Sequence, residues 1–231
     1  METEFVRDNY NAADDSTIKR LSRALWEEIK TFLEKQDIKG SYLDAGCGTG
    51  RYLEYAASLG VKNLTGFDNS KKMIAQSKSR FPVHDTDAHL YVCDIRETTK
   101  LFPPSSFDMI TCTAVIPHIQ KDEDRRSVMC DLIRLLKPGG ELLVCVWAKD
   151  TITDARILSK MEKSKETDSE NDYLVTLEGK QWYYYMFSKQ EFQFFVMECC
   201  RLLGKGLMVK FFQSHDNYFA QISKTAQYHE L

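Results

Sequence analysis

The sequence has no apolar run of about 18 residues or more, so we expect no membrane-spanning helix. No Cys-x-x-Cys pair occurs among its seven cysteines, which argues against a structural zinc site within the chain. The start, Met1-Glu2-Thr3-Glu4, lacks the basic and apolar segments of a secretory signal. The odd number of cysteines then reads most simply as reduced thiols. These absences predict a cytoplasmic protein without a metal site or membrane contact.

The chain also has little excess charge, with a formal net charge of −3. Nucleic-acid binding needs positive potential, so a polyanion would have to be held by local basic groups. The hydrophobic content of 43% over 231 residues is ordinary for a globular protein. It is sufficient for one domain with a sizeable core.

Apolar segments alternate with amphipathic ones through the first two thirds of the chain. Apolar residues at helical spacing predict helices, and glycine or proline ends several of them. The expected helices span residues 16–36, 51–59, 71–79 and 124–136, and the expected strands span residues 41–44, 63–68, 88–94, 107–114 and 141–147. Because helices between successive apolar strands form βαβ crossovers, this pattern predicts a doubly wound, mostly parallel sheet.

The last third of the chain departs from this alternation. Residues 162–172 are polar and are expected to form a loop-like insert. A helix near 189–203 and two strands, 207–213 and 218–222, are expected to follow, the strands forming an antiparallel hairpin. The predicted fold class is therefore α/β: a seven-stranded, mostly parallel, Rossmann-like sheet with an antiparallel C-terminal hairpin.

A glycine-rich segment, Leu43-Asp44-Ala45-Gly46-Cys47-Gly48-Thr49-Gly50, follows the first strand. Glycines there let the backbone approach a ligand, and the next helix begins with free N–H groups. The G-x-G-x-G spacing differs from the G-x-G-x-x-G of nicotinamide and flavin folds. Asp44 can accept from a cationic amino group, whereas it would repel a pyrophosphate.

Acidic residues also end the next two expected strands. Asp68, followed by Asn69, can accept from both hydroxyls of a ribose, and Asp94 can accept from an adenine amine with Ile95 against the ring. The carboxyl ends of parallel strands meet at one edge of a sheet, where ligands bind. The alternative is that Asp68 and Asp94 only cap helices or turns. Together the acids favour a site for a cationic adenosine cofactor.

This arrangement, over about residues 38–147, resembles the class I S-adenosylmethionine-dependent methyltransferases, as does the turn Leu136-Lys137-Pro138-Gly139-Gly140. The resemblance implies S-adenosylmethionine as cofactor and S-adenosylhomocysteine as product. The cofactor contacts it implies are Tyr10, Asp44, Gly46, Cys47, Gly48, Asp68, Asn69, Asp94, Ile95 and Thr111. It divides a single domain, 1–231, into a helical lid (1–37), a cofactor-binding core (38–150), a substrate-side insert (151–190) and a C-terminal helix with hairpin (191–231).

Motifs outside the cofactor site resemble a narrower family, the eukaryotic tRNA wobble-uridine methyltransferases. The motifs are Ala114-Val115-Ile116-Pro117-His118-Ile119, Arg125-Arg126, Val146-Trp147-Ala148, Tyr183-Tyr184-Tyr185-Met186-Phe187 and His215-Asp216-Asn217-Tyr218. That family forms the methyl ester of 5-carboxymethyluridine in the anticodon. This sequence has Pro117 where the family has the first of two histidines, and it keeps only Asp216 and Asn217 of an Arg-Asp-Asn-Trp motif. These departures lie near the expected substrate pocket.

A carboxylate acceptor has a pKa of about 4 and is ionised at neutral pH, so its methylation needs no general base. The protein must align its oxygen with the methyl group and exclude water. We expect His118, Arg20 and Asn217, with Lys19, to contact the substrate. The alternatives are a loop histidine packed beside Pro117 and a solvated helix face carrying Lys19 and Arg20.

The narrower resemblance also implies macromolecular partners. These are the anticodon loop of tRNA and a small zinc-binding methyltransferase activator subunit, which would add a strand along exposed residues 88–92. The aromatic run 182–185 could stack a base or could be core. Two other functions stay open: a small-molecule methyltransferase on the same fold, and a non-catalytic cofactor-binding scaffold.

Overall fold

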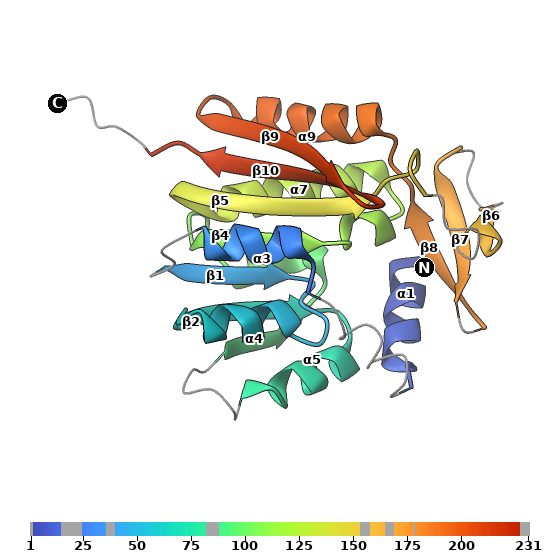
Figure 1. Ribbon diagram of the computed structural model, residues 1–231, viewed down its shortest axis with the longest axis horizontal. Coiled ribbons are helices and arrows are strands. Elements are labelled where there is room, and N and C mark those ends of the chain that lie inside the picture. The colour runs from blue at the N-terminus through green and yellow to red at the C-terminus, as the bar shows by residue number, and fades with distance from the viewer. Residues whose placement is uncertain are drawn as a thin grey trace.

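The computed structural model describes residues 2–14, 25–35, 40–81, 88–152, 158–164, 169–177 and 179–226. A seven-stranded sheet with strand order β3-β2-β1-β4-β5-β10-β9 forms its centre (Figure 1). The strands are β1 (Ser41–Ala45), β2 (Asn63–Asp68), β3 (Ala88–Val92), β4 (Phe107–Thr113), β5 (Leu136–Trp147), β9 (Leu207–Ser214) and β10 (Asn217–Lys224). The first five are parallel, and the hairpin of β9 and β10 joins β5 antiparallel. The predicted fold class is confirmed.

Helices cover both faces of this sheet (Figure 1). They are α1 (Glu2–Asn11), α3 (Glu27–Glu34), α4 (Arg51–Ser58), α5 (Lys71–Lys78), α6 (Thr98–Leu101), α7 (Asp122–Leu135) and α9 (Lys189–Leu203), with 3-10 turns η2 (Ile95–Glu97) and η3 (Ile116–His118). The helices α3, α4 and α5 pack on one face and α7 and α9 on the other. Because side chains alternate along a strand, Tyr42 enters the first core and Leu43 the second.

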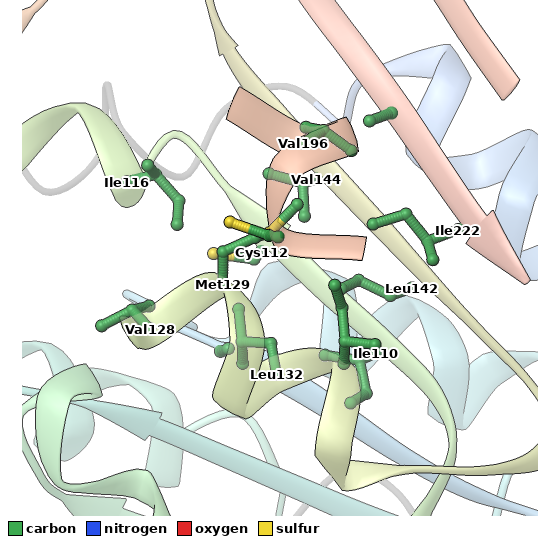
Figure 2. Close-up of a cluster of buried hydrophobic side chains, with 14 of the residues drawn as sticks. Ile110, Cys112, Ile116, Val128, Met129, Leu132, Leu142, Val144, Val196 and Ile222 are labelled. Atoms are coloured by element: carbon green, nitrogen blue, oxygen red, sulfur yellow. The ribbon is translucent and has the colours of Figure 1, made fainter. Parts of the chain in front are cut away.

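The core beneath α7 and α9 combines aliphatic side chains from β4, β5 and α7 with aromatic side chains, some of them from α9. Figure 2 shows Ile110 and Cys112 of β4 and Leu142 and Val144 of β5 facing Met129 and Leu132 of α7. All of these are buried to 0–1% exposure. Burial of each large aliphatic side chain contributes about 1.5–3 kcal/mol, so this layer fixes β4 and β5, whose carboxyl ends carry part of the site.

The predicted insert 162–172 is loop-like at its described interior residues, 164 and 169–171, and strands flank it on both sides. Strands β6 (Met161–Lys163), β7 (Asp172–Leu177) and β8 (Lys180–Tyr185) form a second, antiparallel three-stranded sheet. The sequence analysis did not predict this sheet, whose buried apolar residues lie mainly in β8. Trp182, Tyr183 and Tyr184 are buried to 7% exposure or less.

The N-terminal helix α1 packs between this second sheet and α5 (Figure 1). Val6 of α1 is buried with Trp182 and Tyr183, and Asn9 donates to the main-chain oxygen of Gln181 at 2.6 Å. A predicted helix over residues 16–36 is observed as α3, at 27–34, while residues 15–24 lie outside the described part of the chain.

Other boundaries shift by a few residues. β5 begins at Leu136 and includes the predicted turn 137–140, because Leu136 pairs with Phe107 and the register then shifts until Glu141 pairs with Met109, which leaves the extra residues on β5. The α7 helix starts at Asp122 and ends at Leu135. No helix within the described ranges is long and apolar enough to cross a membrane.

At the amino ends of the strands, the Asp108 carboxylate joins three elements. It accepts from the Ser41 N–H at 2.7 Å, from the Ser41 hydroxyl at 2.8 Å and from the Lys137 ammonium at 2.6 Å. The contacts with Ser41 and Lys137, opposed by partial burial, hold the pKa of Asp108 below its usual value. This one side chain therefore ties β1 and β5 to β4.

Asp108→Ala should lower the free energy of unfolding by about 1–3 kcal/mol, because it leaves the Ser41 N–H without its acceptor. Urea denaturation followed by circular dichroism measures this change. Glu123→Ala is the matched control, since Glu123 is exposed and its nearest ion-pair contact, to Lys121, is 3.9 Å long. An equal loss in both variants would contradict the proposed role of Asp108.

Candidate cofactor and substrate site

A cavity of about 370 Å³ opens at the carboxyl ends of the central strands. Its floor is the glycine loop with the acids that precede and follow it, and its opposite wall comes from α1, η3 and β8. Of the predicted cofactor contacts, those on the cavity wall are Tyr10, Asp44, Gly46, Cys47, Gly48, Asp68, Asn69 and Ile95. The fold thus brings together predicted contacts from four separate segments, at the edge where the sequence predicts a ligand.

The glycine loop holds a conformation that other residues rarely adopt. Gly46 has φ = +77°, and a Cβ there would lie 2.3 Å from Val115 Cγ2. The N–H groups of Gly46 and Cys47 both donate to the main-chain oxygen of Phe67 at 2.9 Å. At Gly48, with φ = +53°, a Cβ would meet no atom within 4 Å, so the backbone faces open space where a ligand can approach.

Asp44 is 1% exposed and is oriented from behind by a chain of hydroxyl groups. Thr111 Oγ1 donates to Asp44 Oδ1 at 2.8 Å and lies 2.6 Å from the Tyr42 hydroxyl. Because Thr111 has one proton, the Tyr42 hydroxyl is the donor in the second contact. Within the described residues, Asp44 Oδ2 is buried without a hydrogen-bond partner. Burial raises the pKa of Asp44 to about 7, although Thr111 and Arg51 oppose the shift.

Asp68 is half-buried and tied to the loop. Its Oδ2 accepts from the Gly48 N–H at 3.0 Å and its Oδ1 from the Ser70 N–H at 2.8 Å. Burial raises its pKa to about 6, against these two hydrogen bonds. Each carboxylate oxygen keeps a lone pair, so the group can still accept from two ribose hydroxyls.

Asp94 is not among the residues that line the cavity. Its carboxylate caps η2 through the Arg96 N–H and forms a two-point ion pair with the Arg96 guanidinium, at 2.9 and 2.7 Å. The capping alternative therefore describes Asp94 in this structure. Its neighbours Cys93 and Ile95 reach the cavity instead. Arg96, two residues downstream, engages both oxygens of this carboxylate because its guanidinium offers a matched pair of donors.

His118 lies on the cavity wall and is 8% exposed. Its Nδ1 lies 2.8 Å from the Tyr183 main-chain oxygen, and its ring centroid lies 4.4 Å from that of Tyr184. Tyr184 in turn stacks on Trp147 at 4.5 Å with an interplanar angle of 8°. Burial lowers the pKa of His118 to about 4, so the imidazole is neutral at pH 7.

The other predicted substrate and cofactor residues are placed differently. Lys19 and Arg20 lie outside the described residues. Asn217 starts β10 opposite Trp147 and is not among the cavity-lining residues. Thr111 is fully buried and supports Asp44 without reaching the cavity.

Arg51 and Tyr42 are site residues that the sequence reasoning missed. Arg51 lines the cavity with its guanidinium 4.7 Å from the Tyr52 ring centroid. Its place directly after the glycine loop was an available signal. Tyr42 and Asp44 lie two residues apart on one strand, so their shared face was also predictable.

Residues 43–144 match the family model of a methyltransferase domain. This matched segment therefore resembles a methyltransferase domain, and the chain shares its fold with a solved S-adenosylmethionine-dependent methyltransferase from Methanosarcina mazei, at a TM-score of 0.66 and 20% identity. Among similar proteins, the probable tRNA methyltransferase 9B of Bos taurus is 28% identical over 150 residues, covering 65% of this chain and 30% of that protein. The tRNA (carboxymethyluridine(34)-5-O)-methyltransferase alkbh8 of Xenopus tropicalis is 35% identical over 124 residues, covering 53% and 18%.

Phosphoethanolamine N-methyltransferase 1 of Arabidopsis thaliana is 31% identical over 144 residues, covering 62% of this chain and 28% of that protein. The chain thus spans less than a third of the length of these relatives. Two further solved structures show the fold. The PH0226 protein of Pyrococcus horikoshii OT3 has a TM-score of 0.70 at 16% identity, covering 97% of this chain and 99% of that one. The protein solved with the Haloferax volcanii Trm112 methyltransferase activator has a TM-score of 0.68 at 16% identity, covering 97% and 100%.

S-adenosylmethionine is the cofactor of this class of domain, and the cavity fits it. The unpartnered, buried Asp44 oxygen suits a cationic amino group, and the open face at Gly48 beside Asp68 suits a ribose. Within the described ranges, no cluster of three or more His, Cys, Asp or Glu side chains could hold a metal ion.

Cofactor affinity should rise with pH up to about 7 and then level off. A bound ammonium favours the ionised form of Asp44, so binding releases the proton that Asp44 holds below its pKa of about 7. Calorimetry between about pH 5.5 and 7.5 measures this effect, before the cofactor's own amino group, of pKa about 7.7–8.0, begins to titrate. The Asp44→Asn variant should bind more weakly with a flatter profile. A profile in that variant that still rises between about pH 6.5 and 7.5 would contradict the assignment to Asp44, since Asp68, with a pKa of about 6, titrates mainly below that range.

Asp68→Asn should weaken cofactor binding, since each lost hydrogen bond to a charged group is worth about 1.5–3 kcal/mol. Asp94→Asn is the matched control, because its carboxylate is engaged by Arg96 away from the cavity. We expect a much smaller loss in the control by calorimetry. If Asp94→Asn loses as much affinity as Asp68→Asn, Asp94 binds the adenine amine after all.

Proposed function

We propose that this chain transfers a methyl group from S-adenosylmethionine to the carboxylate of 5-carboxymethyluridine at the wobble position of tRNA. The observation that carries the proposal is the cavity itself. One side presents acids suited to a cationic cofactor, and the other presents an aromatic wall suited to a flat base. The names of the tRNA methyltransferases among the relatives support the choice of acceptor.

S-adenosylmethionine, held by Asp44 and Asp68, would supply a methyl group on a positively charged sulfur. The acceptor carboxylate would take that methyl group directly, with a neutral sulfide as the leaving group. No proton moves, so the chain's residues have to align the oxygen and exclude water. Tyr10, Trp147 and Tyr184 surround the acceptor side of the cavity and restrict water there.

The acceptor carboxylate needs donors that hold it without blocking the attacking lone pair. Thr113 lines the cavity, and within the described residues its buried hydroxyl has no hydrogen-bond partner. That hydroxyl is a candidate donor, with Arg51 as a cation on the same wall. Arg20 stays a prediction. Asn217, opposite Trp147 in register, is proposed to support that ring.

The proposal includes two partners, the anticodon loop of tRNA and an activator subunit. The β3 strand is an edge of the main sheet, and its Tyr91 and Val92 are 38% and 48% exposed. An activator strand added along this edge would complete the hydrogen bonding and cover these side chains. The structural neighbour solved with the Trm112 activator supports this choice of partner.

A small-molecule amine acceptor is the second candidate function. A neutral His118 on the cavity wall could take a proton from an N–H nucleophile, which a carboxylate acceptor does not require. The phosphoethanolamine N-methyltransferase among the relatives supports this alternative.

Methyl transfer distinguishes the two functions. With radiolabelled S-adenosylmethionine, an anticodon stem–loop carrying 5-carboxymethyluridine should be labelled, most strongly when the activator subunit is present. Because esters are base-labile, mild alkali should release the label as methanol. The same RNA with unmodified uridine is the control. Label that resists alkali, or transfer to phosphoethanolamine in place of RNA, would exclude the carboxylate mechanism.

A further inference from the structure

The two ring nitrogens of His118 have different surroundings. The Tyr183 main-chain oxygen can only accept, so the Nδ1 that lies 2.8 Å from it carries the proton and donates. A neutral imidazole has one proton, which leaves Nε2 as a bare acceptor. Within the described residues, Nε2 makes no hydrogen bond, and it is not among the polar atoms buried without a partner. It is therefore open to the cavity that His118 lines.

The η3 turn that carries His118 is held in place by Arg125, which is 3% exposed. Its guanidinium donates to the main-chain oxygens of Ile119 at 2.8 Å and Gln120 at 2.6 Å, and lies 3.7 Å from the Tyr185 ring centroid. The strand that contains Tyr185 also contains Tyr183, the acceptor for His118. Arg125 and His118 thus both link the turn to this strand. These links restrain the imidazole from rotating, a motion that would exchange the positions of its two nitrogens.

An acceptor lone pair facing the substrate does not suit a carboxylate. Two acceptors repel each other unless a proton lies between them, and protonating this buried imidazole would require a pH far below neutrality. In its neutral form His118 suits a hydrogen-bond donor on the substrate better than it suits a carboxylate, so the substrate contact predicted for it takes this form. The bare Nε2 of His118 suits an N–H or O–H donor on the substrate.

We propose that His118 selects the substrate by accepting a hydrogen bond from the imide N–H of a pyrimidine ring. The identity of that donor rests on the proposed function, since the imide is the ring donor that 5-carboxymethyluridine offers. The neighbouring rings agree with this choice: Tyr184 lies beside His118 and stacks on Trp147. A base on this wall would present its edge to His118 while its 5-substituent turns toward the methyl group.

The test compares two anticodon stem–loops, one with 5-carboxymethyluridine and one with 5-carboxymethylcytidine. The cytidine has the same shape and the same carboxylate, but its ring nitrogen is an acceptor. Wild-type protein with its activator should prefer the uridine substrate in kcat/KM by roughly 10- to 100-fold, the range expected for one unmatched buried hydrogen bond. His118→Gln should lose most of this preference, because its amide can rotate to donate or accept. Unchanged discrimination in His118→Gln would overturn the proposal.

A second measurement does not depend on turnover. The chain contains five histidines, and ¹⁵N-histidine NMR of the protein with S-adenosylhomocysteine, assigned by loss of one signal in His118→Gln, reports the protonation of each ring nitrogen. At pH 7, His118 should show a protonated Nδ1 and a bare Nε2. A protonated Nε2 would overturn the proposal even if the RNA is methylated. If neither RNA is methylated although the cofactor binds, the proposed function fails, and the imide assignment fails with it. A bare Nε2 in that case would leave His118 as a general base for a substrate with an N–H nucleophile.

Discussion

The burial of Asp44 constrains much of the remaining site. A carboxylate at 1% exposure loses its hydration, and the effective cost in proteins is several kcal/mol per ion. Only one of its oxygens receives a hydrogen bond from the described residues, through Thr111. The fold therefore keeps a buried, incompletely hydrogen-bonded carboxylate at the end of β1, and a bound cation would offset the cost of its desolvation. The Tyr42–Thr111 chain makes this possible because it fixes the carboxylate from behind and leaves its other oxygen toward the ligand.

Asp68 couples this group to the backbone of the glycine loop. By accepting from the Gly48 N–H it holds the loop at positive φ, and the same carboxylate faces the cavity. The side chain that supports the loop conformation is thus also placed to accept from a ribose. This coupling explains why an acid at the end of β2 accompanies the glycine spacing. Without the acid the loop would lose a hydrogen-bond acceptor, and without the loop the half-buried acid would lose a donor.

The parallel sheet, the glycine loop and the position of Asp68 were predictable because each depends on local periodicity or on a turn. The contacts of Asp94 were not predictable, because they are made with a guanidinium two residues away and spacing does not distinguish helix capping from ligand binding. The second sheet was missed for a related reason. Its strands are stabilised by pairing of β6 with β7 and of β7 with the aromatic β8, which are contacts that composition does not record. The tautomer of His118 likewise depends on a backbone oxygen 65 positions away in the chain.

The family match covers most of the cofactor side of the cavity but little of its acceptor side. The match to the methyltransferase domain ends at residue 144, within β5, and the acceptor side is built largely beyond it, by Trp147 and the second sheet. Likeness to the domain family therefore bears on the cofactor and says little about the acceptor. The acceptor has to be argued from the wall itself, where aromatic faces are combined with one neutral nitrogen acceptor. Such a wall favours a flat molecule with a donor edge, while Thr113 and Arg51 are the groups proposed to hold an acceptor carboxylate.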